Sequence, residues 1–295
     1  MLKLIQLNGL CSVIAHRGAS AYLPEHTLEA YSLAFAQGVD YIETDVILTR
    51  DNVLVCLHDL ILETTTDVAM RFPERKRPDG HWYTIDFTRV ELKELRVVGR
   101  VNEADRDTVQ GYQISTLDEL ILLVQRLNKV LSRNTAVLIE TKDPQWHAQQ
   151  GKPLDAVLLQ TMTTHNVDTP GSGFIIQSFD EAHLRSLRDT HKCELPLMWL
   201  TSELPSMEKV AAIAAWAQGI NPHRSAIEDT GKPNTAGLAV LERMHELGLK
   251  MFVWTFNDEP DVMRQFIECH GVDGLITNNP DAGVRVLNTG RLKNE

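Results

Sequence analysis

The sequence lacks both a cysteine framework and a long apolar run. Its four cysteines, Cys11, Cys56, Cys193 and Cys269, are widely scattered and form no Cys-x-x-Cys pair, so we expect buried free thiols in place of disulfides or a zinc site. No stretch of about 20 apolar residues is present, which argues against a membrane-spanning helix. The apolar stretch within the first ten residues is too short for a secretion signal. As written, the sequence predicts a cytoplasmic protein, or a periplasmic one if a signal peptide has been removed.

Positive charge is also scarce. The 295 residues include 40 acidic and 29 basic ones, which gives a formal net charge of −11. This charge repels nucleic acid and anionic membranes over most of the surface, so we expect no nucleic-acid partner and no stable membrane insertion. An anionic substrate would need a locally positive pocket. The sequence has no sustained heptads, so it gives no indication of an oligomeric state.

Short apolar runs alternate with helical patterns along the chain. Such alternation predicts a parallel sheet, and about eight strand and helix units fit an irregular TIM (β/α)₈ barrel. The second and third runs are joined by residues 49–52 alone, a link of hairpin length without a helix, so one run is expected to lie outside the barrel or to distort it. The runs cover residues 12–15, 41–48, 53–57, 136–141, 173–179, 195–200, 219–221, 250–256 and 273–277.

Residue types that cap helices mark several helix boundaries. After the first run, a helix is expected to begin at Pro24 and to end at Gly38. Its apolar side chains, Leu28 among them, recur at helical spacing and should be buried. Further along the chain, Thr116 and Glu119 have the spacing of a capping box.

The segment from about residue 60 to 114 interrupts the alternation of strand and helix patterns. It is rich in charge and predicts one clear helix, which begins at Thr88. We interpret the segment as an insertion, after the third run, in a single barrel domain that spans residues 1–295. Its basic residues, among them Arg71, Arg75 and Arg77, indicate either a phosphate-binding patch or, in preference, a solvated loop.

Polar side chains occur at the carboxyl ends of the predicted strands. In a barrel these ends face a shared mouth, where side chains from different strands meet. The residues concerned are His16, Arg17 and Gly18, then Glu43 and Asp45, then His58 and Asp59, then Glu140 and Lys142, and finally Gln177 and Trp254.

Three of these residues are acids that predict a metal site. Glu43 and Asp45 are two apart on one strand, so both side chains point to the same face. Glu140 would bring a third carboxylate to the same mouth. Such a cluster repels an anionic substrate unless a hard divalent cation is bound, so we infer one Ca²⁺ or Mg²⁺. In the alternative, arginine or lysine side chains neutralise each acid.

Two histidines and two cations stand beside these acids. His16 and His58 lie at the ends of different strands, and imidazole is in general a side chain that titrates near neutral pH, so we predict a general base and a general acid, without deciding which is which. Arg17 offers a bidentate fork for phosphate oxygens, and Lys142 lies on the face of Glu140. Trp254 is a candidate contact to glycerol or to a choline head group, with a place in the packing of the barrel as the alternative.

Taken together, several segments resemble the glycerophosphodiester phosphodiesterases. The resemblance extends from about Val13 to Pro280, and the combination is specific although each piece alone is weak. The segments are His16-Arg17-Gly18-Ala19, Leu23-Pro24-Glu25-His26-Thr27-Leu28-Glu29-Ala30, Glu43-Thr44-Asp45-Val46, Leu48-Thr49-x-Asp51, Leu57-His58-Asp59, Glu140-Thr141-Lys142 and Gln177-Ser178-Phe179.

This resemblance implies an irregular (β/α)₈ barrel and a phosphoric diester hydrolase. The implied substrate is a glycerophosphodiester and the implied products are an alcohol and sn-glycerol 3-phosphate, which would place the protein in lipid and glycerol metabolism. The implied route begins with attack of a glycerol hydroxyl on phosphorus, after which water opens a cyclic phosphate. The implied site comprises the metal ligands Glu43, Asp45 and Glu140, the acid and base His16 and His58, and the substrate contacts Arg17, Lys142, Gln177 and Trp254.

Two features depart from the commonest pattern of the family. His26 stands where many members have asparagine, and the insertion is similar to that of the longer bacterial members, which are often exported.

Two other functions are also weighed: a phospholipase D-like or phosphoinositide-cleaving barrel enzyme, and a barrel that binds phosphodiesters without cleaving them. The first would need an exposed apolar rim, and the second would lack one of the paired histidines or metal carboxylates.

Overall fold

The computed structural model describes residues 11–99, 111–229 and 232–291. The N-terminal residues that bear on secretion, and part of the predicted insertion, lie outside these ranges. Within them, Cys11, Cys56 and Cys193 are free thiols, of which the latter two are buried and Cys11 is half-buried. No helix in the described part of the chain is long and apolar enough to cross a bilayer.

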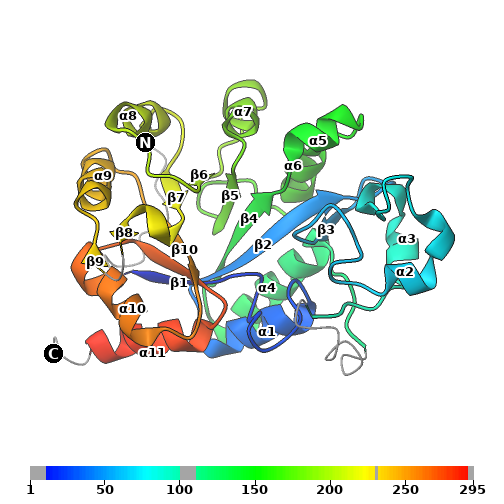
Figure 1. The fold of residues 1–295 in the computed structure, drawn as a ribbon, viewed down its shortest axis with the longest axis horizontal. Helices are drawn as coiled ribbons and strands as arrows, with labels where there is room; N and C mark the ends of the chain where they lie inside the picture. The colour runs from blue at the N-terminus through cyan, green and yellow to red at the C-terminus, as the bar shows by residue number, and fades with distance from the viewer. Residues whose placement is uncertain (1–10, 100–110, 230–231, 292–295) are drawn as a thin grey trace.

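Eight parallel strands form a nearly closed barrel (Figure 1). They pair in the order β10-β11-β1-β2-β4-β5-β6-β7. Parallel bridges from Gly219 to Lys250 and from His223 to Trp254 connect the two ends of this order and bring the barrel close to closure. The strands are β1 (Ser12–Ala15), β2 (Tyr41–Leu48), β4 (Ala136–Thr141), β5 (Phe174–Ser178), β6 (Leu197–Thr201), β7 (Gly219–Pro222), β10 (Phe252–Phe256) and β11 (Gly274–Thr277).

The predicted barrel and all nine predicted strands are confirmed. The third run forms β3 (Leu54–Cys56), which pairs antiparallel with the far end of β2 and is the strand outside the barrel. The prediction that one run lies outside the barrel, which was based on the hairpin-length link before β3, is therefore confirmed. A small ribbon of β8 (Glu228–Asp229) and β9 (Lys232–Pro233) was not predicted from the sequence.

Helices cover the outside of the barrel (Figure 1). Apolar side chains pack between strands and helices in one large core, and a smaller cluster that includes Ile14, Tyr41 and Leu138 fills the barrel interior. The helices are α1 (Leu28–Gln37), α4 (Leu117–Leu131), α5 (Pro144–Gln149), α6 (Leu154–Thr164), α7 (Glu181–Arg185), α8 (Met207–Ala214), α9 (Thr235–Glu246), α10 (Pro260–Gln265) and α11 (Pro280–Arg291).

The first helix begins later than predicted. Thr27 caps α1 by accepting a hydrogen bond from the backbone N–H of Ala30, so Pro24 lies in the preceding turn. Leu28, expected to be buried, is only half-buried, although it packs against the main apolar core. The predicted end is correct, since Gly38 adopts a left-handed conformation with φ of 93°. The predicted capping box of Thr116 and Glu119 is present at the start of α4.

The segment from residue 60 onward extends from one side of the barrel (Figure 1). It contains α2 (Val68–Arg71) and the predicted helix α3 (Arg89–Leu92), and it has its own apolar cluster beside β2 and β3. Arg75 pairs with Glu91 and Arg77 pairs with Asp86, which argues against a phosphate-binding patch among the basic residues that the structure describes here. These ion pairs instead tie the segment to itself.

Candidate active site

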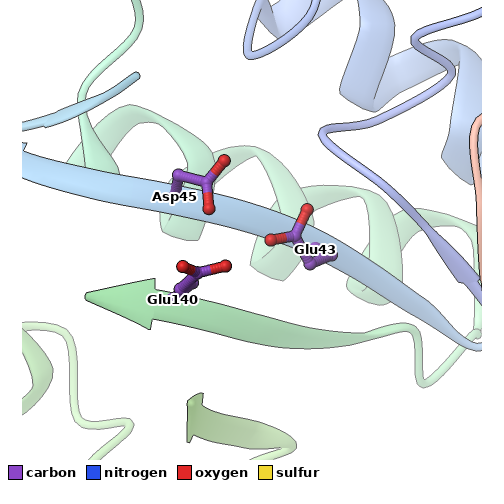
Figure 2. Close-up of side chains that lie close together, drawn as sticks. All are labelled: Glu43, Asp45 and Glu140. Atoms are coloured by element: carbon purple, nitrogen blue, oxygen red, sulfur yellow. The ribbon is translucent and has the colours of Figure 1, made fainter. Parts of the chain in front are cut away.

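Three acidic side chains meet at the mouth of the barrel. Glu43 and Asp45 on β2 and Glu140 on β4 bring carboxylate oxygens within 4.8 Å of one another (Figure 2). The exposed fractions are 1% for Glu43, 1% for Asp45 and 7% for Glu140. We call these three residues the carboxylate triad.

Strand geometry explains why the three carboxylates lie close together. Asp45 and Glu140 are neighbours in the parallel register of β2 and β4. Glu43 shares the face of Asp45, whereas Thr44 points outward, where its hydroxyl lies 2.7 Å from the hydroxyl of Tyr31 on α1. The predicted orientation of the two acids is therefore confirmed.

Two cationic side chains contact the carboxylate triad. The Lys142 ammonium lies 2.5 Å from Glu140 and 3.6 Å from Asp45. The Arg17 guanidinium lies 3.3 Å from Asp45 and is shared with Glu25 at 3.2 Å. The neutralisation considered as an alternative is therefore partly present, but two cations face four carboxylates.

Burial and mutual repulsion shift the pKa values of the carboxylate triad. Burial raises the pKa of Glu140 to about 8, with the charge of Asp45 adding to the shift and that of Lys142 opposing it. Burial and the charges of Asp45 and Glu140 raise the pKa of Glu43 well above its usual range. Burial also opposes ionisation of Asp45, but neighbouring groups, Lys142 first among them, outweigh it and hold that pKa well below its usual range. Two of the three acids are thus poorly compensated.

A divalent cation fits this set of donors. The carboxylate triad supplies only oxygen atoms, which are the ligands that Mg²⁺ and Ca²⁺ prefer. One oxygen of Asp45, Oδ1, is buried and makes no hydrogen bond within the described residues. A cation bound here would favour the ionised form of all three acids.

His16 is held by a residue from the opposite end of the chain. Its Nδ1 lies 2.7 Å from Oδ1 of Asn278, while Nδ2 of Asn278 donates to Asn257. Because the amide oxygen can only accept, Nδ1 of His16 carries the proton and Nε2 is left with its lone pair. Burial, with a contribution from the charge of Arg17, lowers the pKa of His16 to about 3. The imidazole is therefore neutral at neutral pH, with a free lone pair on Nε2, although burial makes it a weaker base than an exposed imidazole.

His58 has a different partner. Its Nδ1 lies 2.6 Å from the carboxylate of Asp59, which places Asp59 in contact with the histidine that precedes it. This contact leaves Nε2 of His58 for another partner. The side chain is 31% exposed, so it is reached by solvent more easily than the carboxylate triad.

His26, noted only as a departure from the family pattern, is part of the site. Its Nε2 lies 2.9 Å from Asp45, and its Nδ1 lies 2.9 Å from the hydroxyl of Tyr31. The side chain is 1% exposed, so these two contacts fix the ring and the carboxylate together. His26, Glu25 and Asn278 were missed from sequence, although the first two lie in a segment that was singled out.

Gln177 and Trp254 are positioned by a shared neighbour. Gln177 is buried and accepts a hydrogen bond of 2.8 Å from Nδ2 of Asn221, while Nε1 of Trp254 donates to the carbonyl of Asn221. Trp254 also packs edge-on against Phe179 and His223. The structure thus brings both residues to the barrel end, and their predicted contacts to substrate stay predictions.

A cavity of about 980 Å³ adjoins the carboxylate triad. Glu140 and Lys142 form part of its wall, and His58 lies on the same wall. The remaining wall comes from the start of the insertion, from α5 and from the segment after β5. A ligand bound at the carboxylate triad therefore has room to extend past His58.

Comparisons with known proteins agree with this geometry. A family model described as the glycerophosphoryl diester phosphodiesterase family matches residues 16–282. A glycerophosphodiester phosphodiesterase of Treponema pallidum is 34% identical, over 93% of this chain and 91% of that protein. A glycerophosphodiester phosphodiesterase of Haemophilus influenzae is 29% identical, over 93% of this chain and 89% of that protein.

Solved structures show the same fold. A putative glycerophosphoryl diester phosphodiesterase from Silicibacter pomeroyi superposes with a TM-score of 0.73 at 26% identity, over 95% of this chain and 94% of that one. An Oleispira antarctica phosphodiesterase in complex with the product sn-glycerol-3-phosphate gives a TM-score of 0.72 at 22% identity, over 95% and 97% of the two chains. The second likeness concerns the fold alone.

Proposed function

The chain belongs to the glycerophosphoryl diester phosphodiesterase family and is a phosphoric diester hydrolase, and from this premise we propose that it cleaves glycerophosphodiesters with the aid of one divalent cation and of two histidines. The observation that supports this most is the buried carboxylate triad, in which the neighbouring cations do not compensate the raised pKa values of Glu43 and Glu140. A divalent cation bound to such a site stabilises the ionised carboxylates, and the bound cation then attracts the anionic phosphodiester. Neither member of the histidine pair nor any acid of the carboxylate triad is missing, which argues against a barrel that only binds.

The cation would be held by the carboxylate triad. When bound, Ca²⁺ or Mg²⁺ would stabilise negative charge that develops on the phosphoryl oxygens. His26 contacts Oδ2 of Asp45 and leaves Oδ1 without a hydrogen bond among the described residues, so this carboxylate is oriented before any cation arrives.

The substrate phosphate would be bound by Arg17 and Lys142. Both side chains lie at the edge of the carboxylate triad, and each is only slightly exposed, at 14% and 12%. Arg17 adopts a left-handed backbone conformation with φ of 58°, and its backbone N–H donates to Glu43. This arrangement fixes the guanidinium close to the acids, where its planar fork can bind two phosphate oxygens.

The two histidines would divide the proton transfers. His16, which is neutral and has its Nε2 lone pair available, would take the proton of the attacking glycerol hydroxyl. His58 lies on the wall of the cavity that can hold the departing alcohol, so we assign to it the donation of a proton to that alcohol. Water then opens the cyclic phosphate, with the two roles exchanged, and sn-glycerol 3-phosphate is released.

An internal nucleophile simplifies the task of the protein. The glycerol hydroxyl is already attached to the phosphorus it attacks, so the site need only orient it, move protons and stabilise charge. A phospholipase D-like reaction would require an apolar rim for lipid chains. The wall of the cavity instead carries charged side chains, among them Asp59, Lys142 and Asp143, which does not favour that reaction.

The route predicts a strict requirement for the glycerol 2-hydroxyl. We expect propane-1,3-diol phosphocholine, which lacks this hydroxyl, to be cleaved at least about a hundredfold more slowly than glycerophosphocholine, because the internal nucleophile is lost. Released choline, measured by an enzyme-coupled assay with both substrates at equal concentration, gives the comparison. Equal rates would show that water attacks phosphorus directly, and failure to cleave glycerophosphocholine, glycerophosphoethanolamine and glycerophosphoglycerol alike would contradict the proposed function itself.

A further inference from the structure

The cavity beside the carboxylate triad has a composition of its own. Its wall nearest the triad holds Glu140, Lys142 and His58, and the wall farther away is formed by the insertion and by α5. If the proposed function is correct, the phosphate lies at the near wall and the alcohol that leaves lies in the rest of the cavity. The residues of the far wall then contact the head group.

Aromatic rings form part of this cavity wall. Trp146 of α5 is half-buried and stacks on Tyr83 of the insertion, with ring centroids 5.4 Å apart and planes 18° apart. The guanidinium of Arg77 covers the Tyr83 ring at 4.4 Å, and Arg77 in turn is paired with Asp86. This stack fixes the indole by contacts from the insertion. Phe179, which is 45% exposed, adds a second aromatic ring, but the Lys142 ammonium already lies over this ring, 5.9 Å from its centroid.

Carboxylates outnumber cations along the cavity. Lys142 is directed to Glu140 and Asp45, so its charge is already compensated by the carboxylate triad. Asp143 is exposed and has no ion pair or side-chain hydrogen bond to any residue in the described part of the chain. Asp180 accepts one backbone hydrogen bond, from His183, and makes no ion pair within the same residues. Two carboxylates on the cavity wall, Asp143 and Asp180, therefore have no cation partner among the described residues.

Aromatic faces combined with uncompensated carboxylates are the chemistry that recognises an ammonium group. A positive charge is attracted to the face of an indole or phenyl ring, and the carboxylates complement the charge without a specific hydrogen-bond geometry. A neutral polyol gains neither contribution, and an anionic head group is repelled. The cavity of about 980 Å³ is large enough for a small amino alcohol.

We propose that this cavity is the head-group site and that it selects cationic head groups, namely amino alcohols with a primary or quaternary ammonium. The preferred substrates are accordingly glycerophosphodiesters of this class. Trp146 supplies the aromatic face, and Asp143 and Asp180 supply the complementary charge. The insertion contributes by holding Trp146 through Tyr83.

A binding experiment tests this assignment without turnover. Choline and 3,3-dimethylbutan-1-ol have nearly the same shape, but only choline is charged, so NMR titration of the full-length, metal-loaded protein with each compound separates charge from size. We expect choline to bind at least about tenfold more tightly. Equal binding of the two compounds, or no binding of choline up to its solubility, would overturn the assignment whether or not the protein hydrolyses phosphodiesters.

Substitutions then locate the site. Trp146→Leu keeps an apolar side chain and should weaken choline binding about fivefold to tenfold, whereas Trp146→Phe keeps a ring and should restore most of the affinity. Asp143→Asn combined with Asp180→Asn should weaken choline binding about fivefold and leave 3,3-dimethylbutan-1-ol unaffected. Asparagine is also a good helix cap, so the second change preserves the start of α7.

Matched controls make the outcome decisive. Asp229→Asn removes the same charge from the exposed strand β8, far from α5 in the molecule (Figure 1), and should leave choline binding unchanged. In turnover, Trp146→Leu should lower kcat/KM for glycerophosphocholine about tenfold relative to glycerophosphoglycerol. An equal fall for both substrates would contradict the head-group assignment while leaving the proposed hydrolysis intact.

Discussion

Replacement of Glu43 by glutamine is expected to lower kcat/KM for glycerophosphocholine by about a thousandfold, since a cation that stabilises the transition state is worth several kcal/mol. The amide oxygen of the introduced glutamine can still accept the hydrogen bond of 2.7 Å that the backbone N–H of Arg17 donates to Glu43. The local backbone is therefore retained, and the loss of charge is the main change.

The same variant has a second expected effect that a mere folding defect would not produce. In the metal-free protein, the Glu43 carboxylate is buried and repelled by the other two acids, so its neutral replacement should raise the melting temperature. Added Ca²⁺ or Mg²⁺ should stabilise the wild type more than the variant, because ligands stabilise the state that binds them. Glu208→Gln, on the exposed surface of α8, serves as the control and should change neither activity nor metal-dependent melting. If added metal raised the melting temperature of the Glu43→Gln variant as much as that of the wild type, the carboxylate triad would not be the metal site.

Removal of either histidine should have the second large effect. We expect His16→Ala and His58→Ala each to lower kcat for glycerophosphocholine by about a hundredfold to ten-thousandfold, the range for loss of a general acid or base. Metal-dependent melting should be retained in both variants. His245→Ala is a matched control, since Nε2 of His245 also contacts a carboxylate, that of Asp273, which precedes β11 at the end of the barrel opposite the mouth.

The leaving group separates the two roles. p-Nitrophenol departs without protonation, so glycerol-3-phospho-p-nitrophenol should be cleaved by His58→Ala at close to the wild-type rate. It should remain a poor substrate for His16→Ala, because the attacking hydroxyl still has to lose its proton. If His16→Ala cleaved this substrate at close to the wild-type rate and His58→Ala did not, His58 would be the base and His16 the acid. Normal turnover of glycerophosphocholine by both variants would show that the histidines are not the acid and base.

Local sequence rules were sufficient to predict the barrel and the shared orientation of the two acids of β2. Alternating strand and helix patterns predicted the eight barrel strands, and the short link after β2 indicated the extra strand. The positions of Glu43 and Asp45 follow from the two-residue period of a strand alone. The start of α1 was misplaced because Pro24 and Thr27 both favour a helix N-terminus, and the side chain of Thr27 provides the cap.

The supporting contacts of the site could not be predicted in this way. His16 and Asn278 are 262 positions apart, and no local pattern connects them. Asn221 likewise meets Gln177 and Trp254 only because the barrel brings β5, β7 and β10 to the same end. His26 lies close in sequence to Asp45, but its role depends on a left-handed backbone conformation with φ of 62°, which is uncommon for histidine.

The most direct test of this account is the rate of sn-glycerol 3-phosphate release from glycerophosphocholine by the wild-type protein after chelation, with metals then added back one at a time. We predict that chelation abolishes hydrolysis and that Ca²⁺ or Mg²⁺ restores it, whereas Na⁺ at equal ionic strength does not. An undiminished rate in the metal-free protein would contradict the central claim that a cation held by Glu43, Asp45 and Glu140 is required for the reaction.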